Sequence, residues 1–187
     1  MSPDSELTRL RNGDVQAVGP LMDRYQHRLY RYLLRMVWQQ ATAEDLFQQT
    51  WIRVIEKIGA YDPNRNFESW LFAVARNLAL DHLRRYQPES LDEPLPSGDS
   101  RAQLIAGSGP GALEQLLTHE RAGWLIEALA ELPAVFREVL TLRFEEEMKI
   151  EEIAVVLAVP LGTVKTRLHR ALKHLRNRIE EKMETRN

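Results

Sequence analysis

The sequence has 187 residues, with 25 Lys and Arg against 27 Asp and Glu, 44% hydrophobic residues and no cysteine. This length accommodates one domain or two small ones, and the lack of cysteine excludes disulfide bonds, cysteine nucleophiles and thiolate metal sites. Because the amino-terminal residues hold no basic segment followed by an apolar run, and no apolar stretch approaches the roughly 20 residues that span a bilayer, we expect a cytoplasmic protein without membrane insertion.

Apolar residues at three- and four-residue spacing predict three helices in the first half of the chain, over roughly residues 20–38, 42–58 and 68–86. A polar turn with an aromatic residue at each end, residues 61–67, separates the second helix from the third. No alternating pattern typical of strands occurs anywhere in the sequence. The predicted fold is therefore all-α.

A segment poor in helix formers follows these helices. Residues 87–111 contain four of the nine prolines and four of the nine glycines. The same stretch has four acidic residues and one arginine, so we interpret residues 88–111 as a flexible acidic linker. A short ordered binding segment around Leu104 and Ile105 is the alternative.

The second half of the chain predicts four more helices, over residues 113–132, 134–144, 150–157 and 161–184. Pro133 separates the first two, because proline is excluded from helix interiors and tolerated at a helix start. The last two are joined by only three residues and fit a helix-turn-helix. The prediction is therefore two small helical domains, residues 1–87 and 112–187, on either side of the linker.

The second helix of this motif is strongly basic. Between Thr163 and Arg178 it has no acidic residue and six positive charges, on Lys165, Arg167, Arg170, Lys173, Arg176 and Arg178. Long donors near the amino end of such a helix reach base edges, and the candidates are Lys165, Thr166, His169 and Arg170. Backbone amides at Gly162 or Thr163 suit a phosphate. A solvated basic face balanced by nearby glutamates is the alternative, but spacing and charge together favour DNA.

The overall charge of −2 does not exclude nucleic acid, because it is unevenly distributed. Residues 1–87 have a net charge of +2, residues 88–111 of −3, and residues 112–187 of −1. Charges are screened over about 8–10 Å in physiological salt, so DNA senses the basic helix more than the total.

These motifs resemble those of the extracytoplasmic-function (ECF) sigma factors, the smallest specificity subunits of bacterial RNA polymerase. Residues 43–51 are similar to the region-two helix that grips the polymerase clamp, and residues 67–77 to the part that reads the minus-ten promoter element. Leu132-Pro133 with Arg137, then residues 152–154 and 162–171, are similar to region four, which reads the minus-thirty-five element.

The resemblance implies a protein that binds core RNA polymerase, directs it to promoter DNA and helps to open the duplex. The implied polymerase contacts are Asp45, Gln48 and Gln49. The implied minus-ten contacts are Arg65, Asn66, Phe67, Arg76, Asn77, Arg84 and Arg85. The implied minus-thirty-five contacts are Arg143, Thr163, Lys165, Thr166, Arg167, His169 and Arg170.

Capturing unstacked bases requires stacking surfaces and backbone cations. Our hypothesis is that the turn at residues 64–66, together with Asn77, forms a pocket for a flipped minus-ten base. The aromatic residues around it are stacking surfaces or core, and the core interpretation is favoured for Trp70. The resemblance also implies an anti-sigma factor as a partner.

Two other classes of function compete with this interpretation. A DNA-binding regulator that works without polymerase would also contain a helix-turn-helix. An enzyme would need a site, and its best candidate is the group of glutamates between Glu145 and Glu152. That group has no histidine at ligand spacing and no nucleophile motif nearby, so we expect no catalysis, metal or cofactor.

The chain departs from the family pattern at two positions. Lys149-Ile150 stands where Ser or Thr commonly precedes the first motif helix, and a lost N-cap costs about 1 kcal/mol. Ala158 stands where the turn commonly has Gly, and a left-handed backbone there costs a further ~1 kcal/mol.

Overall fold

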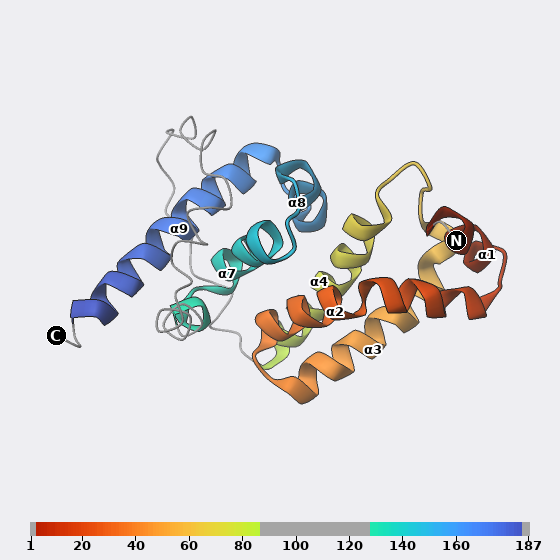
Figure 1. Cartoon of the computed structure of the whole chain (residues 1–187), viewed down its shortest axis with the longest axis horizontal. Helices are drawn as coiled ribbons and strands as arrows, with labels where there is room; N and C mark the ends of the chain where they lie inside the picture. The colour runs from red at the N-terminus through yellow and green to blue at the C-terminus, as the bar shows by residue number, and fades with distance from the viewer. Residues whose placement is uncertain (1–2, 87–127, 185–187) are drawn as a thin grey trace. The chain divides into compact units, whose positions relative to one another are not determined.

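The computed structural model describes residues 3–86 and 128–184 of the chain (Figure 1). The predicted linker and most of the predicted helix at 113–132 lie outside the described residues. All regular secondary structure in the described part is helical, which confirms the all-α prediction. These helices fall into an N-terminal unit, built around α1 to α4, and a C-terminal unit, built around α7 to α9.

The helices of the N-terminal unit follow the predicted order. Their bounds are α1 Pro3–Arg11, η1 Val15–Ala17, α2 Val18–Val37, α3 Gln40–Lys57, η2 Ile58–Ala60 and α4 Phe67–Tyr86. The two short segments η1 and η2 are 3-10 helices. The third predicted helix begins within one residue of its predicted start, while α3 begins two residues earlier than predicted.

The early start of α3 has a local cause in the chain reversal before it. Trp38 ends α2 in a left-handed conformation, with φ +54°, and its amide donates to the carbonyl of Leu34 at 2.8 Å. The reversal is complete within two residues, so the next helix is capped at Gln39, whose carbonyl accepts from the amide of Ala43 at 2.9 Å.

α2 is the central helix of the N-terminal unit. α3 packs along it (Figure 1), and aromatic contacts attach α4 to it. The Tyr32 ring lies 5.2 Å from that of Phe72, and an ion pair of 2.7 Å joins Arg28 to Glu68. Leu29 and Leu33 of α2 are fully buried, as the apolar spacing requires.

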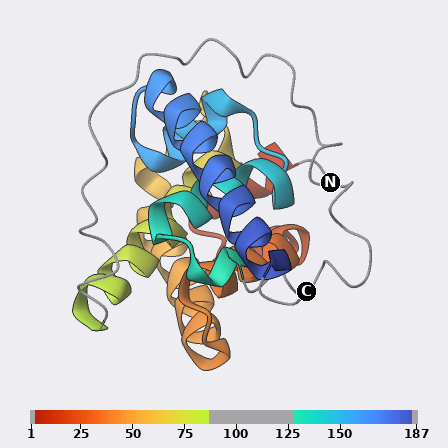
Figure 2. The same ribbon diagram turned by 90° about the vertical axis from the view of Figure 1, so that its left-hand side faces the viewer.

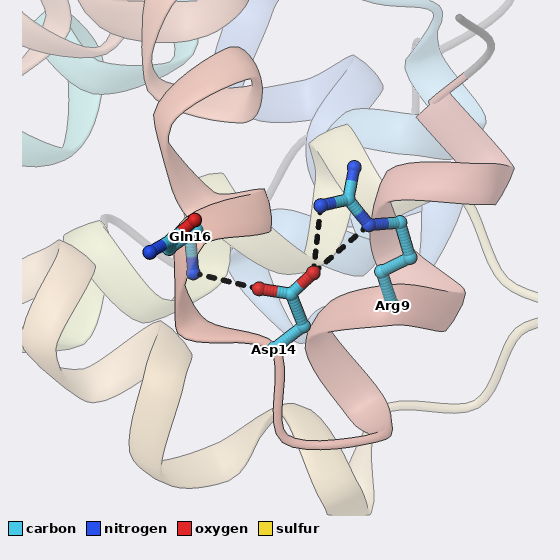
Figure 3. A network of polar contacts seen from close by, with 3 residues as sticks. All are labelled: Arg9, Asp14 and Gln16. Atoms are coloured by element: carbon cyan, nitrogen blue, oxygen red, sulfur yellow. Dashed lines mark hydrogen bonds and ion pairs between the residues drawn. The ribbon is translucent and has the colours of Figure 1, made fainter.

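The sequence patterns did not predict α1, which has only two apolar core residues, Leu7 and Leu10. A polar network holds it to the next segment (Figure 3). The Arg9 guanidinium donates to one carboxylate oxygen of Asp14 at 2.7 and 2.9 Å, and the other oxygen accepts from the Gln16 amide at 3.1 Å. Asp14 thereby caps η1 and links it to α1.

The C-terminal unit contains α7 Ala134–Leu140, η5 Thr141–Glu145, α8 Ile150–Leu157 and α9 Leu161–Glu184. α7 and α9 lie side by side, as Figure 1 and the turned view in Figure 2 show. The bounds of α8 and α9 confirm the predicted helix-turn-helix. The predicted helix at 134–144 exists, but its last turn, η5, is a π-helix, in which the Glu146 amide donates to the Thr141 carbonyl at 3.0 Å.

None of the helices within the described residues is long and apolar enough to cross a membrane.

Candidate nucleic-acid interface

The basic helix α9 buries one face and presents the other. Val164, Leu168 and Ala171 are buried, as their spacing predicts. Outside this stripe lie the predicted base-edge residues. His169 is exposed, and Lys165, Thr166, Arg167 and Arg170 are half-buried. The packing therefore leaves the predicted contacts off the core, where long side chains can reach a groove.

Thr166 has a more restricted role than a general donor. Its hydroxyl donates to the carbonyl of Gly162, one turn earlier, at 3.0 Å. The hydroxyl proton is used within the helix, so the side chain offers DNA a methyl group and an acceptor oxygen. Those groups suit a thymine methyl or a base amino group.

The start of α9 corrects one detail of the prediction. The Thr163 amide donates to the carbonyl of Pro160 at 2.9 Å, and the Val164 amide shares that acceptor at 3.3 Å. The expectation that Thr163 offers a backbone amide to phosphate is therefore wrong, because the helix itself uses that donor. Its half-buried side chain remains a candidate contact.

Arg143 occupies the π-helical turn before the motif. One Nη1 bond of 2.9 Å reaches the carbonyl of Met148, in the loop that leads into α8. The Arg143 side chain is half-buried, and this hydrogen bond holds its guanidinium group in one orientation. Glu147 in the same loop has φ +56°, which shows how sharply the chain turns there.

Arg137, which carries part of the family resemblance, is a structural residue. It is buried, and its Nη1 donates to the carbonyl of Ala130 at 3.0 Å, which ties α7 to the preceding helical turn. Burial lowers the pKa of Arg137 to about 10, because the charged form is removed from water.

In the N-terminal unit, the polar turn between η2 and α4 is closed by local hydrogen bonds. The Asp62 carboxylate accepts from the backbone and side-chain amides of Asn64, at 3.0 and 3.1 Å. The Arg65 amide donates to the Asp62 carbonyl at 3.0 Å. The Arg65 side chain is exposed, and its Nε forms a long ion pair of 3.7 Å with the Asp62 carboxylate.

Asn66 has a structural role in addition to its predicted one. It directly precedes α4, and its Oδ1 accepts from the Ser69 amide at 3.1 Å, as an N-cap does. The residue is nevertheless exposed. A substitution there that removes the cap changes the helix as well as any DNA contact.

Phe67 lies in the aromatic core of the N-terminal unit. It is 6% exposed, and its ring packs against Tyr25 at 5.7 Å, Tyr61 at 5.6 Å and Trp70 at 5.8 Å. The aromatic cluster holds this ring in the core, so Phe67 has a packing role, and its contact with the minus-ten strand stays a prediction. Trp70 is only half-buried, so part of that ring faces outward.

The remaining minus-ten candidates follow Trp70 along α4. Asn77, Arg84 and Arg85 are exposed and Arg76 is half-buried. Trp70, Asn77 and Arg84 are spaced by seven residues, so they lie along one stripe of the helix. This stripe also contains the exposed Asp81, whose carboxylate makes the face less basic than its arginines alone suggest.

The predicted polymerase contacts share an exposed face of α3. Asp45, Gln48 and Gln49 are all exposed. The same face continues to Ile52, which is 56% exposed although it is a large apolar residue. The sequence interpretation omitted Ile52. Its spacing could have indicated it, because Ile52 follows Gln48 by four residues and Gln49 by three, which places it on the same helix face and outside the buried stripe.

No group of three or more histidine, aspartate or glutamate residues in residues 3–86 and 128–184 is arranged to hold a metal ion.

Comparison with known proteins identifies the family of both helical units. Residues 21–89 match the family model for Sigma-70 region 2, and residues 122–175 match that for Sigma-70, region 4. The RNA polymerase sigma factor CarQ of Myxococcus xanthus is 31% identical over 94% of this chain and 96% of its own. The RNA polymerase sigma-H factor of Pseudomonas aeruginosa is 30% identical, with 90% and 89% covered.

A third relative is the ECF RNA polymerase sigma factor SigW of Bacillus subtilis, at 29% identity over 94% of this chain and 95% of its own. Among solved structures, the fold is similar to CnrH in complex with the cytosolic domain of CnrY, with TM-score 0.69, 22% identity and coverage of 95% and 97%. It is also similar to the sigma factor RpoE in complex with the anti-sigma factor NepR from Bartonella quintana, with TM-score 0.63, 21% identity and coverage of 87% and 96%.

Proposed function

Because this chain belongs to the ECF sigma factors of the sigma-70 family and directs RNA polymerase to promoters, we propose that its two helical units divide that work. Residues 1–87 bind core polymerase and capture the minus-ten element, and residues 112–187 read the minus-thirty-five element. The protein is not an enzyme, so its specificity rests on binding. It acts in the cytoplasm, where polymerase and promoter DNA meet.

The observation that carries the minus-thirty-five assignment is the arrangement of α9. The buried stripe of α9 packs into the core of the C-terminal unit, whereas Lys165, His169 and Arg170 lie outside that stripe. Arg170 pairs with a base edge in the major groove, and Arg143, oriented by the Met148 carbonyl, contacts the phosphate backbone.

The minus-ten assignment rests on the turn before α4 and the stripe that follows it. Arg65 and Asn66 are exposed at the turn, and Asn77, Arg84 and Arg85 are exposed along the helix. The half-buried Trp70 lies between these groups and supplies an aromatic surface on which an unstacked base can stack. Phe67 supports that ring from the core, at 5.8 Å between centroids.

The polymerase assignment rests on the exposed face of α3. Asp45, Gln48 and Gln49 supply polar contacts, and Ile52 supplies an apolar anchor beside them. A single exposed apolar residue is ordinary on a protein surface, so the argument for Ile52 is its position beside the three predicted polar contacts on the same helix face.

An anti-sigma factor is the proposed regulatory partner. The support is the similar fold of RpoE, which was solved with the anti-sigma factor NepR. A candidate partner isolated with the tagged chain should compete with core polymerase for it and suppress transcription in a purified system.

The test of the function is reconstituted transcription. Holoenzyme assembled from core polymerase and the purified chain should select promoters with both elements from a randomised library, whereas core polymerase alone should select none. A polymerase-independent regulator would bind its duplex equally well without core polymerase.

The role of the turn between Tyr61 and Phe67, here called the minus-ten turn, is tested with variants that leave the N-cap of α4 intact. Asn66→Ser keeps a side-chain oxygen at the N-cap but removes the amide, so it should reduce promoter opening without lowering stability. Arg65→Ala should also reduce opening. Permanganate reactivity of the minus-ten thymines measures opening, and wild-type reactivity in both variants would refute this assignment.

A further inference from the structure

One side chain spans the whole minus-ten turn from its buried side. Tyr61 lies where η2 ends, and its hydroxyl donates a hydrogen bond to the backbone carbonyl of Arg65, four residues later. Tyr61 is only 4% exposed, although the residues that follow it are exposed. The bond therefore connects the core of the unit to the far end of the turn.

The ring that carries this hydroxyl is fixed by its neighbours. Its centroid lies 5.2 Å from that of Trp70 and 5.6 Å from that of Phe67, in an edge-on arrangement with the latter. Both partners belong to the first turn of α4. The hydroxyl position is thus set by the helix that follows the turn.

The Tyr61 hydroxyl is protonated at neutral pH. Burial, with a smaller effect of the carboxylates of Asp4 and Asp62, raises the pKa of Tyr61 above its ordinary value. The donor is therefore present at neutral pH.

The other side-chain hydrogen bonds of the turn join different parts of it. Asp62 closes the near half, from its carboxylate to Asn64, and Asn66 caps the helix. Each of these bonds joins residues of the exposed segment or the helix start. The Asp62 carbonyl accepts from the Arg65 amide, and the Tyr61 hydroxyl donates to the Arg65 carbonyl from the aromatic cluster. The Tyr61 bond thereby connects the backbone of Arg65 to the buried side of the turn.

We propose that Tyr61 is a positioning residue for minus-ten recognition, whose hydrogen bond to the Arg65 carbonyl holds the turn in the shape that captures unpaired bases. The inference rests on the proposed function of the turn. A turn that is ordered before DNA arrives avoids the entropic cost of ordering it on binding. Loss of this hydrogen bond removes none of the side chains of the pocket, but it allows the backbone that carries them to move.

The test is Tyr61→Phe, which keeps the ring and its packing and removes only the hydroxyl. Holoenzyme with this variant is assayed on a promoter selected from the randomised library, by permanganate reactivity and by binding of single-stranded minus-ten DNA. Both should fall about three- to tenfold, the range that one hydrogen bond supports. Affinity for core polymerase should stay at the wild-type value, and the melting temperature should fall by no more than the few degrees that one hydrogen bond accounts for.

The matched control is Tyr25→Phe, which removes a hydroxyl from the same aromatic cluster without touching the turn. It should open the promoter as the wild type does. Tyr61→Phe should also discriminate less well between the selected minus-ten element and its single-base variants, because a mobile turn accommodates wrong bases more easily. Tyr25→Phe should discriminate as well as the wild type. A general loss of stability would lower occupancy of every promoter equally.

Arg65→Ala separates failure of this inference from failure of the proposed function. If Arg65→Ala opens the promoter normally, the turn does not read the minus-ten element and both ideas fail. If Arg65→Ala is impaired while Tyr61→Phe is not, the turn keeps its function and Tyr61 loses its positioning role. A fall in Tyr61→Phe matched by an equal fall in core-polymerase affinity also overturns the proposal.

Discussion

The backbone amide of Lys149 donates a hydrogen bond to the carboxylate of Glu152 at 2.8 Å, at the first turn of α8. This is one half of a capping box, in which the third helical residue reaches back to the N-cap amide. The other half is missing because Lys149 has no side-chain acceptor. Glu152 therefore offsets part of the cost expected for the lost cap.

Lys149→Ser should complete the box and stabilise the C-terminal unit by about 0.5–1 kcal/mol. Glu152→Ala should destabilise it by a similar amount, because the remaining half is then lost. Urea unfolding followed by helical circular dichroism measures both. Equal stability of Lys149→Ser and the wild type would show that the serine side chain does not reach the orphan amides.

Ala158→Gly should stabilise the same unit by up to about 1 kcal/mol. Ala158 has φ +52°, and an alanine is strained in that region. The gain is reduced because glycine also loses more entropy on folding. Ala154→Gly, in the interior of α8, is the opposite control and should cost about 1 kcal/mol. Loss of stability in both variants would contradict the strain argument.

Arg170→Ala and Lys173→Ala should weaken binding in different ways. If Arg170 pairs with a guanine, its loss costs about 1–3 kcal/mol and relaxes specificity at one position of the minus-thirty-five element. Loss of the exposed Lys173 should lower affinity uniformly and reduce the salt dependence by about one phosphate contact. Holoenzyme binding to a panel of promoter variants at several salt concentrations distinguishes the two patterns, and the reverse pattern would overturn the assignment.

Ile52→Ser should lower affinity for core polymerase about tenfold while leaving the fold intact, because an exposed side chain contributes little to folding but a central apolar contact contributes much to an interface. Val15→Ser is the matched control. Val15 is 52% exposed against 56% for Ile52, in the same unit, but it lies on η1 and outside the α3 face. If both variants bind core polymerase equally well, the α3 face does not carry an apolar anchor.

The N-terminal unit should lose stability in alkaline solution. Burial raises the pKa of Tyr25, with a smaller contribution from Glu68, and burial likewise raises the pKa of Tyr61. The folded state then holds these protons more tightly than the unfolded chain, whose tyrosines ionise near pH ~10. Stability is complete below that pH and falls as the pH rises through the folded-state values.

Urea unfolding at pH values between neutral and about 11 tests this expectation. Tyr25→Phe and Tyr61→Phe should each reduce the alkaline loss, since each removes one of the ionising groups. An alkaline loss that is unchanged in both variants would place its origin elsewhere.

The sequence by itself determined the helices α2 to α4 and α7 to α9 and their order. Apolar spacing is a local property, and it gave the bounds of α8 and α9 and the start of α4 to within one residue. The sequence showed that Ala158 stands where the turn commonly has Gly, and the structure established its left-handed backbone. The basic character of α9 also required no structure.

The tertiary structure decided which side chains are available to DNA. From the sequence, Phe67 was a predicted DNA contact and a core role was favoured for Trp70, but packing buries Phe67 and leaves Trp70 only half-buried. The exposed Ile52 and the short helix α1 also depend on contacts between distant segments. Spacing shows which face of a helix is apolar, whereas burial depends on what covers that face. Only the packed chain holds that information.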